Sequence, residues 1–518
     1  MLFNCAQVKM PTGGEKDTLG PEILVSYPTH LETNYNAKSI VLEFNELVAL
    51  GDPSNNIVIT PPLKNKPNIY LKGGSKLIIE LNDTLEEETT YTINLGASIK
   101  DYNESNPLEN NILVFSTGDI IDSLSAEGMV KHSETELPCA DCRVMLYPED
   151  LITDSIVFKE KPYYFANTNE QGYYRFDYLK GGMYRIIALK DESNNFLFDS
   201  YEDEIGFIDS LIEIKADTVL LNMPLSTFKQ ISEEQELTSF KMNGDYELQL
   251  SFSLPTIDLK LLKDSLEMSS DEFLSIYNSD RDSISYWFIN IPEKNTEWKM
   301  SVKEDEEILE NFSVFFSDDN EDFGLTLPKN NGISKINMKD TIVLTWNHPV
   351  ANFTSDKIKI LKDSLSIKFD VIVSDPMHTK VYFEKEPGNY LFKIDSAEVS
   401  DLYGNVNDSI AHTFVVQKED YYGQISIAVS SSEISRMAIL KNEKDQVVRQ
   451  LLITENNAIS FIDLAPGNYT FFVLHDENKN MKWDTGNYLN RKQPEEVFRH
   501  EEIINVRSNW EIELNLSQ

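Results

Sequence analysis

The amino-acid sequence predicts an all-β chain of tandem β-sandwich domains with an internal duplication, which we write A-B-C-A′-B′. Three observations support this prediction: apolar and polar side chains alternate along short stretches, turn residues recur about every 8 to 12 residues, and two pairs of segments repeat. Tyr91, Ile93 and Leu95, for example, alternate with polar residues, which is the period of a half-buried strand. Long helical periodicity is scarce, and we expect one short helix within residues 261–278.

The first repeat defines domains A and A′. The stretch SIVLEFNELV at 39–48 matches TIVLTWNHPV at 341–350. Further along, TYTINLGASIKDYN resembles NYLFKIDSAEVSDLYGN, and the comparison aligns Asp101 with Asp401. Each copy is typical of an alternating strand that ends in an Asp-containing turn.

The second repeat defines domains B and B′ and has no gap. FDYLKGGMYRIIALKDESNNFLFD at 176–199 matches FIDLAPGNYTFFVLHDENKNMKWD at 461–484 with a constant offset of 285 (461 minus 176). Its pattern predicts a strand, a Gly turn, a second strand that enters the core, and then a loop rich in Asp and Asn.

These patterns divide the chain of 518 residues, which is too long for one ordinary core. The expected boundaries are 1–19 for a lipid-attachment Cys and tether, 20–118 for A, 122–225 for B, 229–328 for a β-rich middle domain C, 331–417 for A′ and 420–518 for B′.

The charge balance excludes some classes of partner. The chain has 86 acidic and 46 basic residues, and its formal net charge is −40. A field of this sign repels phosphates, so we expect no nucleic-acid binding. The sequence has no apolar run of about 18 residues, the length that would predict a membrane-spanning helix.

Cys5 is the candidate site of lipid attachment. It follows Met-Leu-Phe-Asn, with Leu2 three residues before it, a pattern that resembles the end of a bacterial lipoprotein signal. Four residues are too few for a signal peptide, so we expect that the sequence starts inside a longer signal or that the chain was trimmed. The alternative is an incidental Cys near a terminus.

Cys139 and Cys142 form a C-x-x-C pair after Pro138. Such a pair can be redox-active, half of a zinc site, or a local disulfide. The sequence has no second C-x-x-C, which excludes a four-sulfur zinc site within one chain. We expect either a local disulfide or two free thiols.

The two Asp/Asn loops of the second repeat are candidate calcium sites, because oxygen ligands at alternate positions can curl around a calcium ion. The candidate ligands are Asp191, Ser193, Asn195, Asp199 and Glu202 in the first loop and Asp476, Asn478, Asn480 and Asp484 in the second. Neither loop has the Gly that an EF-hand uses at its sixth position, where Phe196 and Met481 stand. Two interpretations stay open: structural calcium at a strand end, or Asx-rich turns that cap their own backbone.

No catalytic constellation is recognisable, and we expect no enzyme. The seven His residues are scattered, and neither H-E-x-x-H nor G-x-S-x-G occurs.

The motifs also carry a resemblance. IVLEFNELV, TTYTINLGASIKDYNESNPL and FSTG in domain A resemble the bacterial Ig-like domain named after S-layer proteins. TNEQGYYRFDYLKGGMYRIIAL in domain B resembles the carboxypeptidase-regulatory or Cna-B-like sandwich, which is related to the Ig fold. The whole chain resembles Ig-like-domain lipoproteins of Bacteroidota envelopes. This resemblance implies an outer-membrane lipoprotein without enzyme activity, displayed on either the periplasmic or the cell-surface face.

The sequence is compatible with two functions. The first is a lipid-anchored scaffold or accessory subunit that contacts an outer-membrane protein partner through sandwich edges and end loops. The alternative is a surface carbohydrate-binding or adhesion protein, which would need exposed aromatic platforms. The candidates for such platforms are Trp287, Trp298, Trp346, Trp483 and Trp510. The repeat aligns Trp346 with Phe44 and Trp483 with Phe198, so we expect both of these to be core residues.

Overall fold

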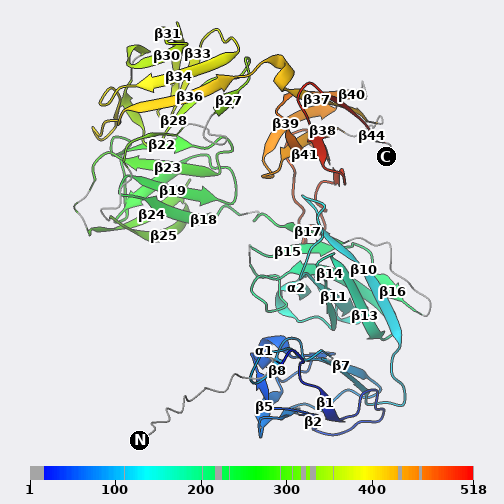
Figure 1. Cartoon of the computed structure of the whole chain (residues 1–518). Coiled ribbons are helices and arrows are strands. Elements are labelled where there is room, and N and C mark those ends of the chain that lie inside the picture. The colour runs from blue at the N-terminus through cyan, green and yellow to red at the C-terminus, as the bar shows by residue number, and fades with distance from the viewer. Residues whose placement is uncertain are drawn as a thin grey trace, which may run out of the picture. The chain divides into compact units, whose positions relative to one another are not determined.

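A computed structural model describes most of the chain. The described residues are 17–109, 111–200, 202–215, 225–232, 234–291, 293, 295–305, 307–316, 322–326, 334–353, 355–429, 435–453 and 458–516. Strands dominate them (Figure 1). The chain divides into two compact units, Met1–Gln230 with Lys482–Phe498 and Ile231–Met481 with Arg499–Gln518. No described helix is long and apolar enough to cross a membrane.

The first sandwich of unit 1 has two main sheets, of order β1-β2-β6-β5 and β4-β7-β9, and a two-stranded β3-β8 ribbon. Its elements are β1 (Ile23–Tyr27), β2 (Ser39–Phe44), β3 (Val48–Leu50), α1 (Pro53–Asn56), β4 (Val58–Thr60), β5 (Asn68–Lys72), β6 (Lys76–Glu80), β7 (Thr90–Asn94), β8 (Ile99–Asp101) and β9 (Ile112–Ser116). The alternating side chains of β2 and β7 bury Leu42, Tyr91 and Ile93 in one core.

The strands of the second sandwich of unit 1 form one continuous hydrogen-bonded sheet. Its order is β12-β11-β14-β15-β17-β10-β13, and β16 pairs with β14. Its elements are β10 (Leu124–His132), β11 (Arg143–Pro148), η1 (Glu149–Leu151), α2 (Ile156–Lys159), β12 (Tyr164–Asn167), β13 (Tyr173–Leu179), β14 (Gly182–Lys190), β15 (Glu204–Phe207), β16 (Ile212–Ile214) and β17 (Leu225–Lys229).

Strand β14 is buried on both faces, which explains its unbroken apolar run. Ile186 packs in the core between β10, β11 and β13, whereas Ile187 and Leu189 pack in a second cluster beneath α2. A strand that is covered on both sides has no solvent face, so it needs no alternation.

The second cluster is completed by a segment from far along the chain. Tyr488 is fully buried there, with its ring 5.3 Å from that of Phe207 and 6.1 Å from that of Phe158. The backbone N–H of Tyr488 donates to the side chain of Gln230 at 2.9 Å. Residues 482–498 therefore belong to unit 1, although the sequence analysis places them in domain B′.

In the third and fourth sandwiches, both in unit 2, the first sheet has the same strand order. The third has sheets β18-β19-β23-β22 and β21-β20-β24-β25; the fourth has β26-β28-β33-β32, β27-β36-β34-β30-β31 and the ribbon β29-β35. In each of these first sheets, the first two strands are in chain order and the last two are in reversed order. The sheet β1-β2-β6-β5 of the first sandwich has the same arrangement. Domain C therefore follows the same plan as A and A′, a relationship that the repeats did not reveal.

The strands of the third sandwich are β18 (Leu237–Asn243), β19 (Glu247–Phe252), β20 (Leu259–Lys263), β21 (Leu266–Glu267), β22 (Phe273–Tyr277), β23 (Ser283–Phe288), β24 (Glu297–Glu304) and β25 (Glu307–Phe315). Those of the fourth, with one 3-10 helix, are β26 (Leu325–Thr326), β27 (Ser334–Ile336), β28 (Ile342–Trp346), β29 (Val350–Asn352), η2 (Ser355–Lys357), β30 (Ile358–Lys362), β31 (Leu365–Ser366), β32 (Asp370–Asp375), β33 (His378–Tyr382), β34 (Gly388–Ile394), β35 (Ser400–Asp401) and β36 (Ile410–Val416).

The short helix expected within 261–278 is wrong. Asp264 and Ser265 have φ of 49° and 68°, and these left-handed residues close a tight hairpin between β20 and β21. Asp363 and Ser364 have φ of 50° and 69° in the equivalent hairpin of the fourth sandwich. The turn and the sheet partners override the weak helical pattern.

The fifth sandwich has sheets β40-β37-β44 and β39-β38-β41-β42, with β43 paired to β41. Its elements are η3 (Glu419–Tyr421), β37 (Gly423–Val429), β38 (Arg436–Asn442), β39 (Val447–Ile453), β40 (Ala458–Leu464), β41 (Gly467–His475), β42 (Val497–Arg499), β43 (Ile504–Val506) and β44 (Glu511–Leu516).

The first repeat is reproduced by strand pairing. Val48 pairs with Asp101 in the β3-β8 ribbon, and Val350 pairs with Asp401 in the β29-β35 ribbon. Both carboxylates are buried and accept backbone N–H groups of the following turn, among them those of Asn106 and Asn405. The Asp of each turn is therefore a backbone-capping residue.

Candidate functional site

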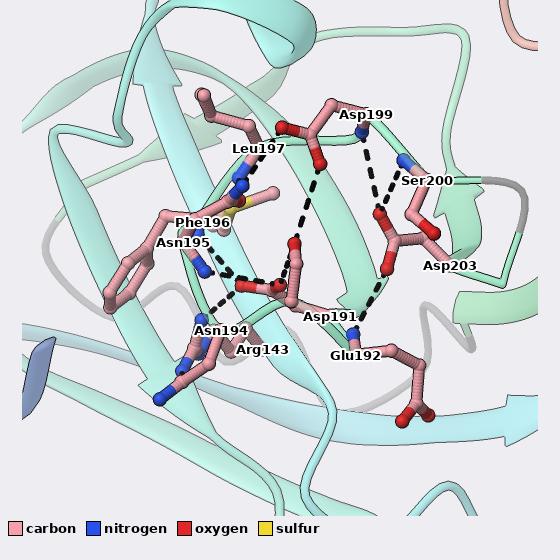
Figure 2. A network of polar contacts seen from close by, with 12 residues as sticks. Arg143, Asp191, Glu192, Asn194, Asn195, Phe196, Leu197, Asp199, Ser200 and Asp203 are labelled. Atoms are coloured by element: carbon pink, nitrogen blue, oxygen red, sulfur yellow. Dashed lines mark hydrogen bonds and ion pairs between the residues drawn. The ribbon is translucent and has the colours of Figure 1, made fainter.

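The loop after β14 is organised by the carboxylate of Asp191 (Figure 2). One of its oxygens accepts the N–H of Phe196 at 2.7 Å and forms an ion pair with Arg143; the other accepts the N–H of Asn195 at 3.2 Å. Arg143 also donates to the side-chain oxygen of Asn194. Only 1% of the Asp191 side chain is exposed, so these donors replace the water that it gives up.

Two further carboxylates close the loop. Asp203 accepts the N–H groups of Glu192 at 2.9 Å and Ser200 at 3.1 Å. Burial raises the pKa of Asp203, and these N–H groups oppose that shift. Asp199 accepts the side-chain amide of Asn195 at 2.8 Å and the hydroxyl of Ser193 at 3.4 Å.

Glu202 does not join this network. Its carboxylate lies 2.6 Å from Nζ of Lys229, and this ion pair lowers the pKa of Glu202. Glu202 stands at the position where an EF-hand has its bidentate glutamate, but its carboxylate is bound to Lys229 instead.

The donor set of the first loop does not fit calcium. Calcium requires six to eight oxygen ligands with free lone pairs, whereas the oxygens of Asp191 face a guanidinium and two backbone N–H groups. A cation beside Arg143 would also meet its positive charge. Within the described ranges, no group of three or more His, Cys, Asp or Glu residues is arranged to hold a metal ion. The first loop thus has the geometry of an Asx-rich turn.

The second loop repeats this geometry. Asp476 is fully buried and accepts the N–H groups of Asn480 at 3.1 Å and Met481 at 2.9 Å; Asn478 also accepts the N–H of Asn480, at 3.0 Å. Asp484 belongs to unit 1, where its N–H donates to Glu495 at 3.1 Å.

The missing glycine is replaced by strained backbone. Phe196 has φ of 69° and Met481 has φ of 62°, the left-handed conformation that glycine adopts most easily. Asn194 and Lys479, at the same offset of 285 (479 minus 194), have φ of 58° and 62°. The capping carboxylate holds both loops in the same conformation.

Cys139 and Cys142 are joined by a disulfide, with their Cα atoms 5.8 Å apart, and both are buried. The hydroxyl of Thr168 donates to the carbonyl of Cys139 at 2.7 Å and accepts the N–H of Cys142 at 2.8 Å. The bridge therefore closes the turn that leads into β11. Cys5, the expected lipid-attachment site, lies outside the described residues.

The tryptophans are mostly buried. Trp287, Trp298 and Trp346 are each less than 10% exposed, and the core position predicted for Trp346 is confirmed. Trp483 packs at the edge of the core cluster that contains Tyr488, and its indole N–H donates to the carbonyl of Glu495 at 3.0 Å. Trp510 is 55% exposed, which makes it the most exposed of the five tryptophans, and Cζ of Arg507 lies over its ring, 5.0 Å from the centroid.

A cavity in unit 1 was missed by the sequence analysis. It has a volume of about 450 Å³ and lies between the first sandwich and the Asp191 loop, with Phe196 as part of its wall. Its other walls come from β4 and from the Pro-rich turn at 61–69. No motif marks it, because its two sides are about 100 residues apart in sequence.

The comparisons with known families match two parts of the chain. Residues 17–117 match the family described as bacterial Ig-like domain, and residues 415–496 match the family described as uncharacterized protein conserved in bacteria (DUF2141). No curated protein shows a significant match.

Solved structures with detected similarity are remote. Titin domains A168–A170 are 13% identical over 54% of this chain and 98% of that one, with a TM-score of 0.15. The Bacteroides ovatus mixed-linkage glucan utilization locus SGBP-B is 10% identical over 74% and 94%, with a TM-score of 0.21. An S-layer protein is 11% identical over 93% and 67%, with a TM-score of 0.15. Together, the strand topology and the match at 17–117 establish an all-β chain of tandem Ig-like sandwiches.

Proposed function

We propose that this chain is a non-enzymatic scaffold or accessory subunit of the bacterial outer membrane, held there by a lipid on Cys5 and bound to an outer-membrane protein partner. In this proposal, the second and fifth sandwiches are of the carboxypeptidase-regulatory or Cna-B-like kind, and the envelope is that of a member of the Bacteroidota. The observation that best supports a scaffold is the tandem repetition of one sandwich plan in the first, third and fourth sandwiches.

The edges of the sheets in unit 2 support protein–protein contact. Strands β32 and β39 end their sheets in the described part of the chain, and they expose the apolar side chains of Ile372, Val373, Val447 and Leu452. An edge strand offers unpaired N–H and C=O groups to a partner strand. Three of the five tryptophans are buried and Trp483 is partly buried, which gives the carbohydrate-binding alternative little support.

The lipid anchor can be tested by fractionation. The Cys5→Ser variant, expressed with the complete upstream signal, should leave the membrane fraction, because the lipid on Cys5 carries the membrane affinity. A variant that stays with membranes in high salt would show that Cys5 does not anchor the protein.

The scaffold role needs a second experiment. The wild-type protein should co-purify with a defined outer-membrane protein after cross-linking and detergent extraction. Recovery as a lone monomer that binds a glycan array would overturn the scaffold proposal in favour of the carbohydrate-binding one.

A further inference from the structure

The cavity beside the Asp191 loop combines positive charge with an apolar wall. Lys64 and Lys66 line it from the Pro-rich turn of the first sandwich, and Lys161 lines it from the second. All three lysines are exposed, and none of them forms a side-chain ion pair in the described part of unit 1. Three lysines without an ion pair among the described residues therefore line one cavity, although the chain has a net charge of −40.

The ammonium group of Lys161 is affected by the charges around it. Desolvation lowers the pKa of Lys161, and the charges of Lys66 and Arg143 lower it further. Arg143 is already paired with Asp191, so its charge is compensated. The charge of Asp191 partly opposes these effects at Lys161, but neither Lys66 nor Lys161 has an ion-pair partner in the described part of unit 1. An anion between these two lysines would relieve their repulsion.

The apolar part of the cavity is rigid. Phe196 is 3% exposed, and the centroid of its ring lies 4.0 Å from Cζ of Arg143 and 5.3 Å from Nζ of Lys161. Figure 2 shows this ring directed away from the Asp191 carboxylate that fixes its backbone. Ile57 and Leu63 extend the apolar surface, and the prolines of the turn have a fixed φ.

We propose that this cavity binds a phosphate monoester with a short apolar body. Lysines are compact point charges, which suits a dianionic phosphate better than a planar carboxylate that needs a fork of donors. A cavity of about 450 Å³ is within the size range of small-molecule sites. The proposal is independent of the scaffold function, since it concerns a ligand within unit 1.

Calorimetric titration of the full chain with hexyl phosphate, inorganic phosphate and hexanol tests this site. Hexyl phosphate should bind most tightly, and its affinity should fall as salt is added. The Lys66→Gln and Lys161→Gln variants should each lose about tenfold in affinity, the usual effect of removing one charge-assisted hydrogen bond. Lys72→Gln is the matched control, because Lys72 is exposed on β5 of the same sandwich and does not line the cavity.

A second arm distinguishes a soluble ligand from a lipid headgroup. Vesicles that contain phosphatidic acid are compared with vesicles of neutral lipid, for the wild type and for Lys161→Gln. Binding of hexyl phosphate or of the acidic vesicles, if it is lost in the cavity variants, supports the proposal. Which of the two binds shows whether the ligand is a soluble phosphate ester or a lipid headgroup. Absence of binding to both, or binding that the cavity variants retain, would overturn it.

Discussion

Nδ1 of His348 lies 2.8 Å from a carboxylate oxygen of Asp401, and both residues are buried. The rings of Tyr246 and Trp287, from the third sandwich, have their centroids 5.4 Å and 5.8 Å from that of the imidazole. The pair therefore joins the third and fourth sandwiches within unit 2. In the first sandwich, the repeat places Glu46 at the position of His348, and desolvation and the charge of Asp101 raise the pKa of Glu46.

Replacing His348 should weaken unit 2. The His348→Ala variant removes a partner of a buried carboxylate and should cost about 2–3 kcal/mol of local stability. Hydrogen exchange of β28 and β29 should therefore become faster. The matched Glu46→Ala change should leave exchange of β2 and β3 unchanged or slower, because it removes a like charge. Equal effects at the two positions would contradict a specific role for the His–Asp pair.

Asp101 should make the first sandwich sensitive to acid. Burial raises the pKa of Asp101, but the N–H groups of Asn106, Glu104 and Ser105 outweigh burial and hold the pKa below its usual value. A lowered folded-state pKa stabilises the fold above the unfolded pKa of about 3.9, and this stability is lost as the pH falls through the folded value. Exchange of the amides of residues 104–106 should speed up as the pH falls below about 4, after correction for intrinsic rates. In Asp101→Asn this additional pH dependence should disappear; an unchanged profile would assign it to other groups.

The Tyr488 side chain should stabilise the second sandwich through its ring and not through its hydroxyl. The hydroxyl is buried and has no hydrogen-bond partner among the described residues. Tyr488→Ala should cost about 3–5 kcal/mol, as for other large aromatic residues in cores. Tyr488→Phe should be neutral or slightly stabilising, since it removes an unsatisfied polar group. Calorimetry of the full-length variants measures both, and a costly Tyr488→Phe would mean that the hydroxyl has a partner.

Calcium should not change the thermal stability of the chain. The Asp191 carboxylate is already occupied by Arg143 and backbone N–H groups. Melting curves in excess calcium and in chelator should therefore coincide. A calcium-dependent rise that Asp191→Ala abolishes would establish the calcium interpretation of this loop instead.

The repeats predicted the local geometry of the loops well, because each copy contains both the capping carboxylate and the N–H groups that it accepts. Asp191 and Asp476 cap loops with matching left-handed residues, and both partners of each cap lie within six residues. The equivalence of domain C with A′ was missed, although the pentapeptide Leu-Lys-Asp-Ser-Leu occurs at both 262–266 and 361–365. That short match marks the hairpins in which two consecutive residues have positive φ.

The cavity and the burial of Tyr488 could not be predicted from local pattern. Each depends on side chains from distant parts of the sequence, and neither side alone carries a recognisable motif. Arg143 is a similar case, since its pairing with Asp191 depends on the register between β11 and β14.

The late arrival of Tyr488 has a consequence for folding during synthesis. Gln230, which accepts its N–H, precedes it by 258 residues. At translation rates of about 5–20 residues per second, this separation corresponds to roughly 13–50 seconds. During that interval, the apolar cluster of the second sandwich lacks Tyr488 and stays partly exposed. A chaperone that holds unfolded chains by their exposed aromatic side chains would be able to bind this cluster.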